Sequence, residues 1–82
     1  MTTVTVRWFA AAAEAAGAAQ TVAHAPDGAS AASVLASLTE GNERLGRIVA
    51  SSSLLADGSA LTDRDERLTA TTLDVLPAFA GG

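Results

Sequence analysis

The alternating stretch at residues 3–9 constrains the fold more than any other part of the chain. Three apolar residues occupy every second position, namely Val4, Val6 and Trp8. The residues between them are polar, so the stretch predicts a strand with one buried face and one face near solvent. A strand of this kind must bury its apolar face against a second layer of structure.

A second strand-like run, Thr72–Leu76, lies near the C-terminus. Pro77 has no N–H to donate to a sheet ladder, so this strand should end there. The five residues that follow can reach roughly 16–18 Å if extended. Gly81 and Gly82 carry no Cβ, so they can enter a channel too narrow for side chains. We therefore hypothesise that residues 78–82 form a flexible tail and that the Gly82 α-carboxylate is the reacting group.

The segment after the first strand is predicted to continue as a short helix and a second strand. Alanine and glutamate between Ala10 and Ala16 are strong helix formers. Ala18–Ala25 is expected to form the second strand, paired with the first. In that strand we expect Val22 to face inward, with Gln20 and His24 nearer to solvent. We assign His24 no catalytic role, because no serine or acidic residue lies at a sequence spacing that would suggest a catalytic triad.

The middle of the chain predicts one main amphipathic helix. Ser30 is a plausible N-cap residue behind the Pro26–Gly28 turn. Four apolar residues then follow the spacing of a single helix face: Ala31, Val34, Leu35 and Leu38. Gly41 should end this helix, and Asn42 should begin one further turn.

A hairpin and a charged loop should connect this helix to the last strand. Asp57-Gly58 between two strand-like runs, Ser51–Ala56 and Ser59–Leu61, suits the two positive φ angles of a type I′ turn. Asp63–Arg67 is expected to be a solvated surface segment. The predicted element order gives an α+β domain of two layers, with the first and last strands side by side at the centre of the sheet.

Composition excludes several classes of function. Eighty-two residues are enough for one domain, here residues 1–82. The chain has no cysteine and one histidine, so we expect no disulfide, no thiol nucleophile and no metal site. The net charge of −4 argues against nucleic acid and favours a partner with a basic surface. The five arginines are scattered, so no anion pocket is predicted. We expect a cytoplasmic protein without a signal or membrane segment.

Three stretches resemble one known family, the small subunit of molybdopterin synthase among the ubiquitin-like sulfur carriers. Val4–Gly17 is similar to that family's first strand and short helix, Leu54–Gly58 to its turn, and Leu73–Gly82 to its hydrophobic–proline–hydrophobic–Gly-Gly ending. The resemblance implies a ubiquitin-like β-grasp, a mixed sheet packed on one main helix. Ala78 departs from the family's usual second proline, and Thr69–Thr72 departs from its acidic-glycine turn.

The resemblance also implies a mechanism. A ubiquitin-activating-like adenylyltransferase would use ATP to adenylate Gly82, and sulfur from a donor would convert the acyl-adenylate to a thiocarboxylate. The tail would then enter the large subunit of molybdopterin synthase, in an assembly of two small and two large subunits, and donate sulfur to a pterin precursor for molybdenum cofactor biosynthesis. The chain would bind no cofactor and catalyse nothing alone.

The outer sheet face near the tail is predicted to bind the partner. If Leu73 and Val75 face the helix, Leu76 faces away from it, on the same side as Phe9. Together with Phe79 they would form an exposed apolar patch, the kind of surface that marks an interaction site. Pro77 and Ala80 would be the neighbouring partner contacts, with Gly81 and Gly82 in the partner's active site.

Three alternatives remain open at this point. Sulfur carriers for thiamin or cysteine synthesis share the fold and the Gly-Gly ending. A ubiquitin-like modifier would instead be ligated through Gly82 to lysines of target proteins. A plain binding module would have a tail without chemical function.

Overall fold

The first two strands form an antiparallel pair at one side of the sheet. The computed structural model describes residues 1–78 of the chain. Strand β1 spans Thr2–Trp8 and pairs with β2, Gln20–Ala25. The predicted alternation of β1 is confirmed, because its three apolar residues, Val4, Val6 and Trp8, are all at most 4% exposed.

The orientation of Val22 was predicted wrongly. Its side chain is 52% exposed, whereas Ala23 and Ala25 are buried. The register places Val22 opposite Thr5, on the outer face of the sheet. Because side chains alternate along a strand, the position of His24 near solvent already required Val22 to point outward as well.

Helix α1 spans Ala11–Ala16 and connects β1 to β2. Gly17 ends it with φ 73°, as its place after the alanine run suggests. The helix begins after Ala10, whose φ of 51° is unusual for a residue with a Cβ. This sharp turn separates Phe9 at the end of β1 from the first helical residue.

Two helices of equal length follow. Helix α2, Ala31–Leu38, begins at a capping box in which the side chains of Ser30 and Ser33 each accept a hydrogen bond from the other's backbone N–H. Helix α3 spans Glu43–Ala50. The predicted extra turn at Asn42 is thus a complete helix, whose first turn is capped by the Asn42 side chain.

The predicted hairpin and last strand are confirmed. Strand β3 spans Ser53–Ala56 and β4 spans Ser59–Leu61. Asp57 and Gly58 have φ angles of 48° and 84°, as a type I′ turn requires. Strand β5, Thr72–Leu76, lies parallel to β1 and antiparallel to β3. The sheet order is β2-β1-β5-β3-β4, so the first and last strands meet at its centre.

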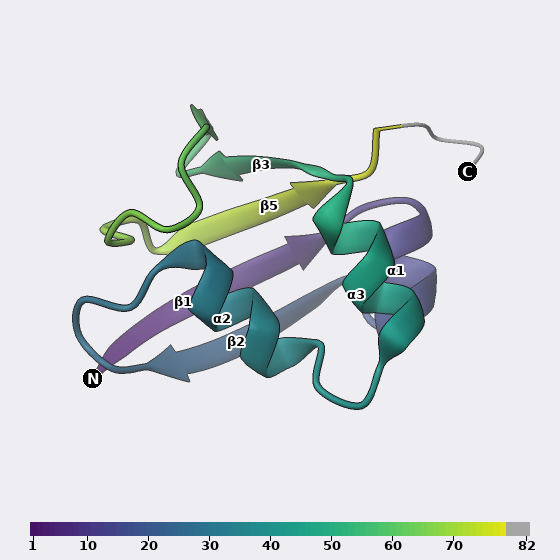
Figure 1. Cartoon of the computed structure of the whole chain (residues 1–82), viewed down its shortest axis with the longest axis horizontal. Helices are drawn as coiled ribbons and strands as arrows, with labels where there is room; N and C mark the ends of the chain where they lie inside the picture. The colour runs from purple at the N-terminus through teal and green to yellow at the C-terminus, as the bar shows by residue number, and fades with distance from the viewer. Residues whose placement is uncertain (79–82) are drawn as a thin grey trace.

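All three helices contribute to one core on the same side of the sheet. The buried cluster combines inward side chains of β1, β2, β3 and β5 with residues from each helix, among them Ala12, Val34, Leu35, Leu45 and Val49. Figure 1 shows α2 lying across β1 and β2, with α3 beside the end of β5. The opposite face of the sheet has no helix over it among the described residues. This is the predicted α+β arrangement of two layers.

The connection from β4 to β5 is tied to two helix ends, although it was expected to be a solvated segment. Arg64 donates from its guanidinium to the carbonyl oxygens of Val49, at 2.9 Å, and Ser52, and so caps the end of α3. Its own carbonyl accepts from the Ala32 N–H in the first turn of α2, at 2.9 Å. The rest of the predicted Asp63–Arg67 segment is exposed, as expected.

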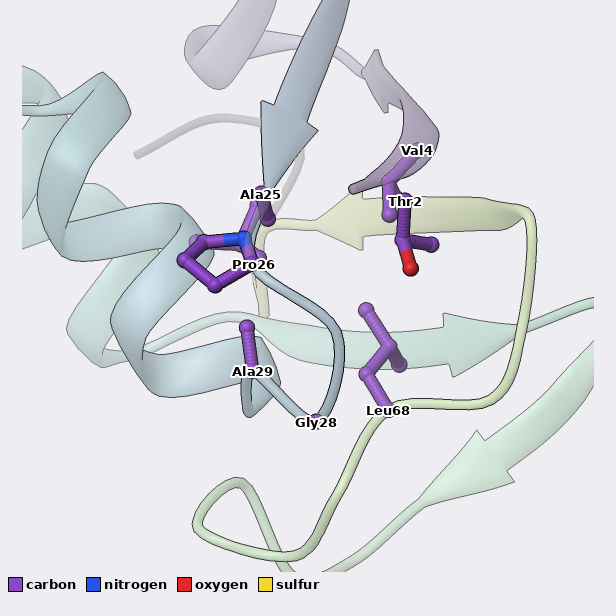
Figure 2. A pocket seen from close by; sticks show the side chains of 8 residues that line it. Thr2, Val4, Ala25, Pro26, Gly28, Ala29 and Leu68 are labelled. Carbon is purple, nitrogen blue, oxygen red and sulfur yellow. The ribbon is translucent and has the colours of Figure 1, made fainter.

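Leu68 closes the core at the base of the sheet. Its side chain extends from the loop toward Thr2 and Val4 (Figure 2). The cavity that remains between them has a volume of about 10 Å³. This is barely enough for one water molecule, so the cavity is a packing gap rather than a ligand site.

Candidate functional site

The candidate site is the point where the chain leaves β5. Leu73 and Val75 are fully buried against the helices, so Asp74 and Leu76 point to the outer face of the sheet, as predicted. Leu76 and Pro77 are half-buried and Ala78 is exposed. The strand ends at Leu76, directly before the proline that lacks a ladder donor.

Four of the predicted site residues lie outside the described residues: Phe79, Ala80, Gly81 and Gly82. Their proposed roles, including the reacting carboxylate of Gly82, therefore stay predictions. The described part of the site consists of Phe9, Leu76 and Pro77 and the residues around them.

The described part of the predicted apolar surface lies on the outer face and includes one residue that was not predicted. Phe9 is 38% exposed, and its N–H donates to the Val75 carbonyl at 3.2 Å, which places it beside Leu76. Leu55 lies opposite Asp74 in the register, so it is on this face too, diagonal to Leu76. We call Phe9, Leu55 and Leu76 the exit patch. Leu55 was missed, although two consecutive leucines in a strand require one of them to face outward.

An ion pair lies next to the exit patch on the outer face, with Asp74 buried and the Arg7 side chain 49% exposed. The Arg7 guanidinium donates to both carboxylate oxygens of Asp74, at 2.5 and 2.7 Å. Asp74 is only 4% exposed, and this pairing explains how a carboxylate is accommodated on an otherwise apolar part of the strand. The Arg7 hydrogen bond holds the pKa of Asp74 below its usual range, against the opposing effect of burial.

The same arginine supports Phe9. Its guanidinium carbon lies 5.8 Å from the centre of the Phe9 ring, within the range of a cation–π contact. Arg7 therefore connects Asp74 on the central strand to the aromatic residue at the end of β1. This arrangement fixes the ring at the edge of the exit patch without burying it.

A second surface, on the helix side of Pro77, was not predicted. Arg44, Arg47 and Ile48 of α3 and its C-cap residue Ser51 line a hollow together with Ala11, Pro77 and Ala78. The expectation that the arginines form no cluster is thus wrong for Arg44 and Arg47. Their spacing of three residues within a helix was the signal that would have placed them on one face.

The described residues offer little for other chemistry. Within residues 1–78 no group of three or more metal-ligating side chains comes together. His24 is exposed and its Nδ1 lies 3.3 Å from the Thr3 hydroxyl, and Trp8 is a core residue whose Nε1–H donates to Thr21. None of the helices in this part of the chain has the length and apolar character needed to cross a membrane.

Comparison with solved structures establishes the fold. The chain has the ubiquitin-like β-grasp fold, with a mixed five-stranded sheet and helices on one face. It is similar to a candidate molybdopterin converting factor subunit 1 from Pyrococcus furiosus, with a TM-score of 0.81 and 20% identity over 96% of this chain and 100% of that one. No protein-family model and no curated protein sequence matches the chain.

Two modifier proteins are similar to the same extent. Small archaeal modifier protein 1 from Haloferax volcanii has a TM-score of 0.79 and 18% identity over 96% of this chain and 100% of that one. The protein of the same name from Methanosarcina acetivorans has a TM-score of 0.78 and 24% identity over 100% of this chain and 98% of that one. At these identities the comparisons define the fold and leave the function to be argued from the site.

Proposed function

We propose that this chain is a ubiquitin-like sulfur carrier whose Gly82 carboxylate is converted to a thiocarboxylate for molybdopterin synthesis. The observation that carries the proposal is the position of β5. The last strand lies at the centre of the sheet and ends at Leu76, directly before Pro77 and beside the partly exposed exit patch. The sequence Phe79-Ala80-Gly81-Gly82 therefore starts from a rigid base next to a surface suited to a partner.

The chemistry requires activation because carboxylate oxygen is a poor leaving group. An oxygen of the Gly82 carboxylate attacks the α-phosphorus of ATP, pyrophosphate leaves, and an acyl-adenylate forms. Hydrosulfide then attacks the acyl carbon, AMP leaves with the electron pair of the broken carbon–oxygen bond, and the thioacid loses its proton to give the thiocarboxylate. If the donor is a persulfide, an acyl disulfide forms first and a second thiol must reduce it. The chain has no cysteine, so that thiol belongs to another molecule.

The proposed chemistry requires two partner proteins. An adenylyltransferase of the ubiquitin-activating type would bind ATP and the tail. The large subunit of molybdopterin synthase would then receive the thiocarboxylate, with two copies of each subunit in the assembly. The similarity in fold to a candidate molybdopterin converting factor subunit supports this assignment. In this proposal the small chain supplies the nucleophile and its partners supply the acids, bases and phosphate-binding groups.

Intact-protein mass spectrometry tests the carrier function. The full chain is incubated with ATP, the adenylyltransferase of its own cell and a sulfur donor, and a variant lacking Gly82 serves as the control. We expect a mass increase equal to the replacement of one oxygen by sulfur, in the full chain alone. If the enzyme is shown to be active on another substrate and no increase occurs, the proposal is wrong. Addition of the large subunit and the pterin precursor then tests the pathway against thiamin or cysteine synthesis.

A second candidate function is protein modification. The structural similarity to two small archaeal modifier proteins supports it, and ligation also begins with adenylation of a terminal glycine. All five basic residues of this chain are arginines, so it has no lysine to which a second copy could be ligated. Covalent adducts in cell lysate that require Gly82 would indicate this function. If such adducts form and the chain shows no sulfur-dependent mass increase, the second candidate function is correct and the first is wrong.

A further inference from the structure

We propose that the hollow between α3 and Pro77-Ala78 is a second docking site, which binds a carboxylate-bearing segment of the adenylyltransferase that activates the tail. This inference rests on the proposed function, because it names a contact of that same partner. The exit patch lies on the outer face of the sheet, whereas this hollow lies on its helix side. The two surfaces therefore flank the base of the tail.

Helix α3 has two distinct faces. Leu45 and Val49 are buried in the core. Four other residues share a different face through the spacing i, i+3, i+4 and i+7, namely Arg44, Arg47, Ile48 and Ser51. Figure 1 shows α3 ending beside the end of β5, which brings this face next to the start of the tail. The helix therefore presents a continuous surface to a partner protein that binds beside Pro77.

The charge of the hollow is opposite to that of the whole chain. The net charge is −4, yet two exposed arginines lie together here. Within residues 1–78 the ion pairs are Met1 with Asp27 and Arg7 with Asp74, so neither Arg44 nor Arg47 is paired there. The two guanidinium groups are available for a partner of negative charge. Arginine is the side chain best suited to bind carboxylates, because its planar donors match their two oxygens.

The rest of the hollow is apolar, and this defines the occupant. Ile48, Pro77 and Ala11 are half-buried and form its walls, and the hollow has a volume of about 500 Å³. A hollow that combines apolar walls with two cations fits a peptide segment in which aspartate or glutamate is next to an apolar side chain. A basic segment would be repelled, and a wholly apolar segment would leave the arginines without partners.

Binding on both sides would fix the direction of the tail. Leu76 belongs to the exit patch and Pro77 to the hollow, so adjacent residues would be held from opposite sides of the sheet. A partner that contacted the exit patch alone would leave the helix side of the tail base uncovered. Contact on both sides would aim the residues after Ala78 toward the active site of the adenylyltransferase.

Charge reversal tests this inference. Arg44→Glu and Arg47→Glu are compared with Arg67→Glu, an exposed control with the same change in net charge. Isothermal titration calorimetry measures the Kd for the purified adenylyltransferase in the presence of ATP, and circular dichroism confirms that each variant is folded. We expect each hollow variant to raise Kd about fivefold or more and the control to remain within about twofold. The difference should shrink between about 0.05 and 0.5 M salt.

A photo-crosslinking amino acid at position 51 gives an independent readout. Ser51 lines the hollow, so the crosslinked peptide of the adenylyltransferase should contain aspartate or glutamate near the attachment point. A basic peptide, or no crosslink in a complex that forms, would contradict the inference. If the wild-type chain binds and is adenylated while all three charge variants behave alike, the hollow is not a docking site and the proposed function stands. If the wild-type chain neither binds nor is adenylated, both proposals are wrong.

Discussion

Replacement of Arg64 by methionine should destabilise the protein, although the sequence places this residue in a charged surface loop. Its guanidinium donates to the carbonyl oxygens of Val49 and Ser52, where helix α3 ends. The last carbonyls of a helix have no partner within the helix, so they depend on groups of this kind. Methionine keeps the apolar stem of the side chain and removes the donors and the charge.

The expected loss follows from the two hydrogen bonds. A hydrogen bond to a charged group contributes about 1.5–3 kcal/mol to stability when it is buried, and less when water can replace it. Arg64 is half-buried, so we assign about 1 kcal/mol to each bond and about 2 kcal/mol to the pair. For a domain of this size each kcal/mol shifts Tm by about 4–8 °C, so Tm should fall by about 8–16 °C.

Urea and thermal unfolding, followed by circular dichroism, would measure this loss. Arg67→Met is the matched control, because Arg67 lies three residues away in the same loop and its side chain is exposed. The control should lower the free energy of unfolding by less than about 0.5 kcal/mol. If Arg64→Met and Arg67→Met have the same effect, the cap on α3 contributes nothing and our interpretation of the loop is wrong.

Three further predictions concern the exit patch, the ion pair and the hairpin. Leu76→Asp should weaken binding to the large subunit of molybdopterin synthase by about tenfold in calorimetry, while Val22→Asp, a change on the same sheet face away from the tail, should not; equal effects would count against the patch. The pKa of Asp74 is lower in the folded protein than in the unfolded chain, where it is about 3.9. The ionised carboxylate therefore stabilises the fold at pH values above about 3.9, and this stabilisation is lost as the pH falls through the folded-state pKa. Asp74→Asn should therefore lower stability most at neutral pH and least in acid, and parallel wild-type and variant curves in pH-dependent urea unfolding would contradict the role of Arg7. Gly58→Ala should cost about 1 kcal/mol in urea unfolding, because φ is 84° while no atom lies within 4 Å of the added Cβ; unchanged stability would show that the turn can relax.

The strands and turns were predictable because their signals are local. The apolar alternation of β1 requires nothing beyond neighbouring positions, and Asp57-Gly58 suits the turn that connects β3 to β4. Pro77 marks the end of β5, because it lacks the donor that would continue the ladder. The element order also predicted that the first and last strands lie side by side at the centre of the sheet, and the strand order confirms it.

The errors arose where distant segments decide the outcome. In the sequence Arg64 resembles a solvated charge. Its contacts with the end of α3 depend on the tertiary fold, which no local sequence pattern predicts. Helix α3 is complete because Asn42 both caps its first turn and donates to the Ala15 carbonyl at 3.0 Å. Val22 could have been placed correctly from alternation alone, because His24, two positions further along the strand, was already expected near solvent.

The parallel pairing of β1 with β5 has a consequence for synthesis on the ribosome. Arg7 and Asp74, which meet across this pair, are separated by 67 residues. At translation rates of 5–20 residues per second, β5 is synthesised about 3–13 s after β1, and only then can the centre of the sheet form. A chain that stops before residues 72–76 lacks the buried Leu73 and Val75, so we expect it to stay unfolded and exposed to proteases. Every copy that folds has therefore been translated at least to the base of its tail.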